Sequence, residues 1–231
     1  MATWHPGHPM PSAPLRRSFV HPVALGCAAL MLLASCHGSG KHASTTSAVP
    51  ATDAKGAPVS LSLSLGSLKV QAAGAPRPFD RRTAQSIRKL VNEYIATGIA
   101  RPLFTGSSAT GLVGYFTPTL LARVGPKGRD RAALTDERAP VITSVTKTIK
   151  GPLNLVALED HGRIVMIGAQ FSISVRGTTD QGPLTVTRLG NLVLEPNSHK
   201  IWYISGYSVI VRRENGGSST TQKATTTTAA P

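Results

Sequence analysis

Few residues of this chain have the types and spacing that acid–base, nucleophilic or metal chemistry requires. The acidic side chains between residues 59 and 214 fall almost entirely at expected turns and element ends, so no two stand as a general acid and a general base. His161 and His199 each stand in an expected turn, whereas a metal site needs about three or four converging ligands. Neither a Gly-x-Ser-x-Gly elbow nor a phosphate-binding glycine loop occurs. We therefore expect no catalytic residue, no metal and no cofactor.

Three polar residues in strand-like segments are the candidates for a binding pocket: Gln170, Arg188 and Tyr207. Arg188 interrupts an alternating apolar face, and a buried guanidinium there would need a partner and could hold an anionic ligand. The alternative is a β-bulge at Gly190 that shifts the register and turns Arg188 toward solvent. Tyr207 suits the core or a sheet face as well as a ligand contact.

Cys36 offers a different chemistry, because it follows an apolar segment and two small residues. The apolar run from Val20 to Leu33 is too short to cross a bilayer as a stable helix. It ends in Leu33-Ala34-Ser35-Cys36, which resembles the bacterial lipobox, where the cysteine becomes the lipidated first residue of the mature protein. Cys27 would be removed with the signal peptide. The sequence thus predicts a signal peptide over residues 1–35 and a lipid anchor on Cys36.

The export route has two readings. Arg16-Arg17-Ser18-Phe19-Val20 resembles a twin-arginine motif, which would imply translocation of an already folded protein. Alternatively, Arg16 and Arg17 are the ordinary positive region of a signal peptide for the general secretory route.

The strong positive charge suggests nucleic acid at first sight. Lys and Arg number 25 against 11 Asp and Glu, a net charge of +14. Residues 75–214 hold 19 of the basic and 10 of the acidic residues, so +9 falls on this region, without a consecutive basic block. Outside the cell the available anions are phospholipid headgroups and wall polymers, so we expect no nucleic-acid partner.

Low-complexity segments flank the part of the chain that can fold. Residues 36–58 are rich in Gly, Ser, Ala, Thr and Pro and predict a flexible tether. Residues 215–231 are rich in Thr and Ser and predict a disordered tail. The folded domain is therefore expected over residues 59–214.

Periodicity divides this domain into a strand, helices and then a series of strands. Strict alternation over 59–65 predicts a strand, and apolar spacing of three and four after Asp80 predicts a helix that stops near Gly98. A second helical region reaches Val124, with a short turn of helix at 130–137. Five strands are expected over 141–149, 153–158, 163–176, 184–195 and 201–213. Interior glycines at 168, 190 and 206 predict a strongly bent sheet. This order predicts an α+β cone, with the strand and helices packed in a curved antiparallel sheet.

Three stretches resemble the nuclear transport factor 2-like (cystatin-like) superfamily, in particular its secreted or anchored bacterial members, which include mammalian-cell-entry-associated proteins. They are Tyr94-Ile95-Ala96-Thr97-Gly98 with Pro102-Leu103, the Phe116-Thr117-Pro118 break, and Ile201 through Arg212. The resemblance covers residues 59–214 and implies the cone-shaped fold. Enzymes of that superfamily use Asp or His inside the cone, and this sequence departs from that pattern, so the resemblance implies no activity.

We therefore expect a bacterial lipoprotein at the outer face of the cytoplasmic membrane, with a non-catalytic binding or assembly domain. Its expected partners are the membrane through the lipid anchor, and envelope proteins or anionic envelope polymers. The alternatives are a binder of a small apolar or anionic ligand in the cone and, less favoured, an isomerase- or cyclase-like enzyme. A basic helix face is expected to be solvated or to contact anionic headgroups or acidic wall polymer: Arg81, Arg82, Arg88 and Lys89.

Overall fold

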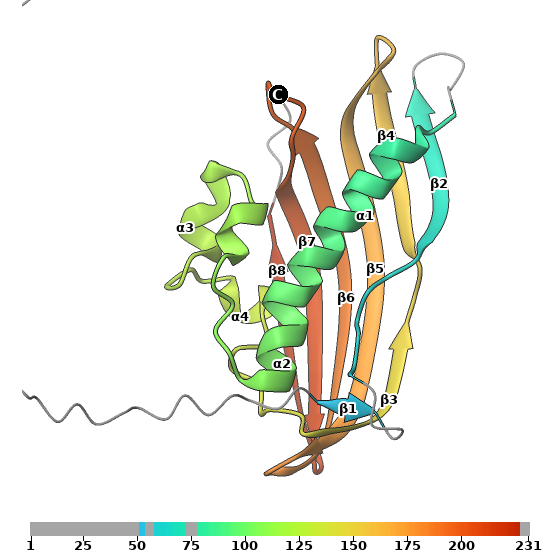
Figure 1. Cartoon of the computed structure of the whole chain (residues 1–231). Coiled ribbons are helices and arrows are strands. Elements are labelled where there is room, and N and C mark those ends of the chain that lie inside the picture. Colours follow the sequence, from blue (N-terminus) through green and yellow to red (C-terminus); the bar gives the residue numbers. More distant parts are fainter. Residues whose placement is uncertain (1–50, 54–57, 73–77, 227–231) are drawn as a thin grey trace, which may run out of the picture. The chain divides into compact units, whose positions relative to one another are not determined.

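The computed structural model describes residues 51–53, 58–72 and 78–226 (Figure 1). The predicted lipobox Leu33-Ala34-Ser35, the lipidation site Cys36 and the arginines Arg16 and Arg17 lie outside the described residues. Most of the predicted tether, 36–58, lies outside them as well. Among the described residues, no helix combines the length and the apolar character needed to cross a membrane.

One mixed sheet of eight strands dominates the described residues. The longest strand, β5, pairs with β6 along one edge, and along the other edge it pairs with β3 over one half and β4 over the other. β6, β7 and β8 follow in antiparallel order, while β1 joins β3 and β2 joins β4 in parallel. The strands are β1 (Thr52–Asp53), β2 (Leu65–Ala72), β3 (Ser144–Lys150), β4 (Leu153–Asp160), β5 (Arg163–Thr179), β6 (Gly182–Pro196), β7 (Trp202–Asn215) and β8 (Ser218–Thr225).

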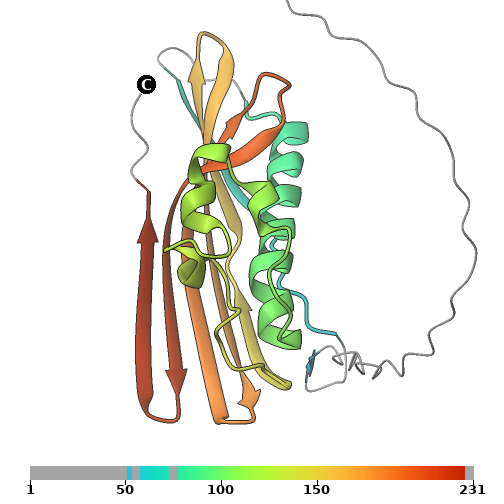
Figure 2. The ribbon, with the colours of Figure 1, turned by 90° about the vertical axis from the view of Figure 1, so that its left-hand side faces the viewer.

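The helices cover one face of this sheet, as Figures 1 and 2 show. Helix α1 (Arg81–Ile95) begins at Asp80, whose carboxylate accepts hydrogen bonds from the backbone N–H groups of Arg82 and Thr83. The chain continues through a π-helical turn, η1 (Ala96–Ala100), into α2 (Arg101–Thr105), which ends at the left-handed Gly106. Short turns follow: η2 (Leu112–Tyr115), η3 (Pro118–Leu120), α3 (Leu121–Val124) and α4 (Arg131–Leu134).

The core lies between the helices and the inner face of the sheet. Alternate residues of β5 are buried on this side, among them Ile167, Ala169, Phe171 and Ile173, as the period-two pattern predicts. The intervening residues of β5 point to the opposite, outer face. No helix covers the outer face in Figures 1 and 2, and large apolar side chains such as Leu158 and Leu189 are exposed there.

The predicted α+β cone is wrong. The described residues are 48% strand and 24% helix, and the sheet is open rather than closed around the helices. The physical reason lies in residues 106–137, where the expected helices break into turns of three or four residues at Gly111 and at Thr117-Pro118. Pro118 has no N–H to donate, so it starts a new turn instead of continuing the previous one.

The predicted boundaries of the folded part also change. β8 lies within residues 215–231, where composition predicts a disordered tail. Gly216 and Gly217 both have positive φ and form a tight turn that folds β8 back on β7, and Ala224 is buried against the core. At the other end, Thr52 and Asp53 of the predicted tether pair with β3. Leu61 and Leu63 are buried as alternation predicts, yet the strand itself begins only at Leu65.

Candidate binding surface

A row of uncharged polar side chains crosses the outer face of the sheet. Register places Asn154 of β4 opposite Gln170 of β5, Gln170 opposite Asn191 of β6, and Asn191 opposite Ser208 of β7. Ser208 in turn lies opposite Thr225 of β8. We call these five residues the amide row. Neighbouring strands lie about 4.8 Å apart, so the row extends roughly 19 Å across the five strands.

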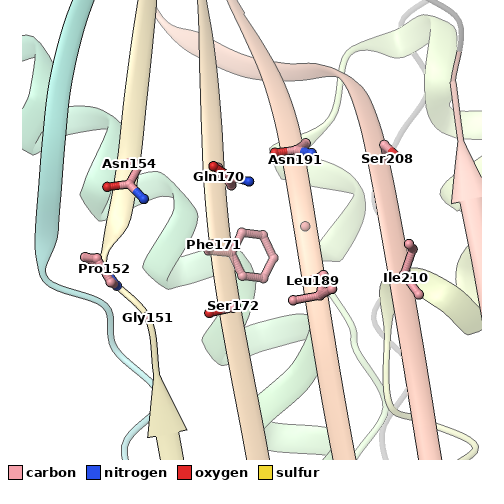
Figure 3. A pocket seen from close by; sticks show the side chains of 11 residues that line it. Gly151, Pro152, Asn154, Gln170, Phe171, Ser172, Leu189, Asn191, Ser208 and Ile210 are labelled. Carbon is pink, nitrogen blue, oxygen red and sulfur yellow. The ribbon is translucent and has the colours of Figure 1, made fainter.

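The amide row borders a hollow of about 410 Å³ (Figure 3). On its other side the hollow is lined by the next row of outer-face residues, Ser172, Leu189 and Ile210, which are also opposite one another in the sheet. The Leu189 side chain is 50% exposed. The hollow therefore combines amide and hydroxyl groups on one side with aliphatic surface on the other.

Gly190 and Phe171 together form the floor of this hollow. Gly190 belongs to the inner-facing set of β6, and the space that its side chain would take is filled by the ring of the paired Phe171. A Cβ atom at Gly190 would collide with that ring. The ladder is continuous through Gly190, and the irregularity between β6 and β7 lies instead opposite Val193 and Leu194, where Ser205 of β7 is the bulged residue. The bulge at Gly190, one of the two expectations for Arg188, is therefore wrong.

The amides of the row differ in how far the protein itself uses them. The side-chain oxygen of Asn154 accepts hydrogen bonds from the Ser67 N–H at 2.9 Å and from the Ser67 hydroxyl at 3.0 Å. Within the part of the chain that the structure describes, no protein hydrogen bond engages the side-chain amides of Gln170 and Asn191. A free side-chain amide offers two N–H donors and one carbonyl acceptor, which complements hydroxyl and amide groups of a ligand.

Arg188, the second candidate, lies on the inner face and not in the hollow. Its side chain is 1% exposed, and Nη2 donates to Asp136 Oδ2 at 3.0 Å and to the Thr135 carbonyl at 3.3 Å. Its Nη1 donates to the Ala133 carbonyl. Arg213 Nη2 donates to the other carboxylate oxygen of Asp136 at 2.6 Å. Arg188 is thus buried with a carboxylate partner, and this ion triad holds the α4 segment against β6 and β7.

Tyr207, the third candidate, is a core residue on the same inner face. Its hydroxyl donates to Asp130 Oδ2 at 2.7 Å, and its ring meets the Phe116 ring edge-on at a centroid distance of 6.0 Å. The Arg123 guanidinium lies 5.8 Å from the ring centroid. Burial and the hydrogen bond to Asp130 raise the pKa of Tyr207 well above its ordinary value. Of the three candidates, the structure therefore brings only Gln170 to the hollow.

The sequence does not predict the partners of Gln170 in the amide row. Asn154, Asn191 and Ser208 each occupy an outward position of a strand, which is a signal that the sequence does contain. What brings them together is the register between strands, which no single strand specifies.

Arg81, Arg82 and Lys89 of the expected basic helix face are exposed on α1, and Arg88 is half-buried. Among the described residues, no three His, Cys, Asp or Glu side chains gather closely enough to hold a metal ion. No protein-family model, no curated protein and no solved structure matches the chain. The resemblance to the nuclear transport factor 2-like superfamily stays a prediction.

Proposed function

We propose that the chain is a lipoprotein anchored at the outer face of the cytoplasmic membrane, whose folded domain binds a glycan of the cell envelope without catalysis. The observation that carries this proposal is the amide row beside a hollow on a sheet face that no helix of the described residues covers. Lipidation at Cys36 would keep this face in the compartment where envelope glycans are found.

The chemistry of the hollow favours a glycan. Each sugar hydroxyl both donates and accepts hydrogen bonds, as do the amides of Gln170 and Asn191 taken as whole groups. Leu189 and Ile210 offer aliphatic surface to the C–H faces of sugar rings. The groups of the row recur at the strand spacing, which suits a ligand built from repeated units. A peptide would more readily add a strand to the sheet edge at β8 than lie across a face.

The experiment compares binding of purified protein to soluble, uncharged wall-glycan fragments. The test variants are Gln170→Ala and Asn191→Ala, and the matched control is Gln85→Ala, which removes an exposed side-chain amide from α1 on the other side of the sheet. A hydrogen bond contributes about 1 kcal/mol, so each test variant should weaken binding roughly fivefold. The control should bind like the wild type.

Two results would contradict the proposal. One is a wild-type protein that binds none of the fragments. The other is a set of variants in which Gln170→Ala and Asn191→Ala bind as well as Gln85→Ala does.

A further inference from the structure

A second polar hollow lies on the same outer face, toward the C-terminal end of β5. Lys147 of β3 and Arg176 of β5 are exposed and stand directly opposite each other in the ladder. Like charges directly opposite each other destabilise a sheet. Among the described residues, no ion pair engages either side chain. The fold alone gives no reason for this arrangement of charges.

The local backbone holds these two cations around a concave surface. A register shift between Val145 and Lys147 leaves Thr146 as a bulged residue, and its hydroxyl donates to the Arg176 carbonyl at 3.1 Å. Gly177 allows the strands to approach, because a Cβ there would collide with Ile142. The result is a hollow of about 400 Å³ lined by Thr146, Lys147, Arg176, Gly177, Thr178 and Pro183.

Arg176 and Pro183 also line a neighbouring hollow of about 420 Å³. Glu214 belongs to the lining of that neighbouring hollow. Gln170 and Arg176 are six residues apart on β5, so they share the outer face about 20 Å from each other. Between them lie the hydroxyls of Ser174 and Thr187, 3.0 Å apart, and the exposed Arg212 opposite Thr187. Together with Ser172, which lines the first hollow, these groups form a polar path beside Leu189 from the amide row to the two cations.

We propose that Lys147 and Arg176 form an anion subsite, so that the glycan bound at the amide row is an acidic one. The group bound there is a phosphate or a carboxylate, which the planar guanidinium of Arg176 can hold through two parallel hydrogen bonds. The hydroxyls of Thr146 and Thr178 line the same hollow. An anion between Lys147 and Arg176 also removes their mutual repulsion. This inference rests on the proposed function, since it names the class of glycan.

The test measures binding of acidic wall-glycan fragments and of the same fragments after chemical removal or amidation of their acidic groups. The variant is Lys147→Gln/Arg176→Gln in the full-length protein. The control is Arg101→Gln, which removes an exposed cation from α2 on the helix side. We expect the affinity of the double variant for the acidic fragments to fall at least about tenfold, since charge-assisted hydrogen bonds are removed. Its affinity for the neutralised fragments should equal that of the wild type. The loss should shrink as salt is added.

A thermal measurement checks the subsite independently of any glycan. Inorganic phosphate should raise the melting temperature of the wild type and of Arg101→Gln, and leave that of the double variant unchanged. The double variant without phosphate should be at least as stable as the wild type, because the substitutions relieve repulsion and leave no buried charge.

The outcomes separate the two proposals. Equal affinity for acidic and neutralised fragments, with the amide row still required, would overturn the anion subsite and leave the glycan function standing. Phosphate stabilisation through Lys147 and Arg176 without any glycan binding would overturn the glycan function alone. Binding of anionic lipid vesicles through Lys147 and Arg176, in place of acidic glycan, would overturn the acidic-glycan inference.

Discussion

Removing the charge of Asp136 tests the account of the inner face most sharply. The Asp136 carboxylate is fully buried and accepts from Arg188 through Oδ2 and from Arg213 through Oδ1. In Asp136→Asn the two arginines would keep their charges, and Arg188, which is 1% exposed, could not reach water. Breaking a buried ion pair in this way costs about 3–5 kcal/mol. For a domain of this size the melting temperature should fall by roughly 6–20 °C.

A second substitution, at Arg188, tests which of the two losses of stability is larger. Arg188→Met removes the buried cation, while Asp136 keeps Arg213, whose side chain is 11% exposed and can be partly hydrated. We expect Arg188→Met to cost less than Asp136→Asn. The double variant Asp136→Asn/Arg188→Met should be more stable than Asp136→Asn alone, because it contains no stranded buried charge.

Urea unfolding followed by circular dichroism measures all four proteins of this cycle. Near-additive costs for the two substitutions would refute the triad as the element that holds α4 on the sheet. A loss of less than about 1 kcal/mol in the free energy of unfolding of Asp136→Asn would also refute it, since breaking a buried ion pair costs more than that.

Three further outcomes are expected. Arg131, the Ser108 hydroxyl and the Ala109 N–H lower the pKa of Glu137 to about 2; its ordinary value is 4.5. This carboxylate therefore contributes up to about 3 kcal/mol to the free energy of unfolding. The contribution should be complete above pH 4.5 and should fall as the pH drops toward 2. Urea unfolding measures this fall, and the part that comes from Glu137 should be absent in Glu137→Gln. Gly190→Ala should cost about 1–3 kcal/mol in the same assay because the Phe171 ring must move; an unchanged stability would show that the ring does not fill that space. Cys36→Ala should release the protein from membranes, whereas an unmodified Cys36 in the mass spectrum of the mature wild type would refute the anchor.

The strands were the part of the fold that the sequence predicts best. Alternation over 163–176 and 184–195 predicts β5 and β6 closely, because one face of each is buried and the side-chain period is two. The sequence does not predict β8, because Ser and Thr suggest low complexity, although β-branched Thr suits a strand once β7 offers a partner edge. Gly98 does not stop the helix: it is buried in the π-helical turn that joins α1 to α2.

The site was predicted only in part, for a reason of the same kind. Polarity within a strand is enough to single out Gln170, but its neighbours Asn154 and Asn191 join it only through register. The sequence indicates that a buried Arg188 needs a partner, yet Asp136 lies 52 residues away and occupies an expected turn. Local patterns describe what a residue needs, whereas the pairing of distant segments decides which residue supplies it.

Protection of a cysteine on the outer face would show directly whether a glycan binds there. In the lipoprotein proposed here Cys36 is blocked by lipid, so a cysteine introduced at Leu189, in the hollow, or at Gln85, on α1, would be the one reactive thiol among residues 36–231. The measurement is the rate of maleimide labelling of Leu189→Cys and Gln85→Cys, with and without soluble acidic wall glycan. If the glycan binds at the hollow, it slows labelling at position 189 and leaves the rate at position 85 unchanged. Equal rates at position 189 with and without saturating glycan would contradict the proposed binding.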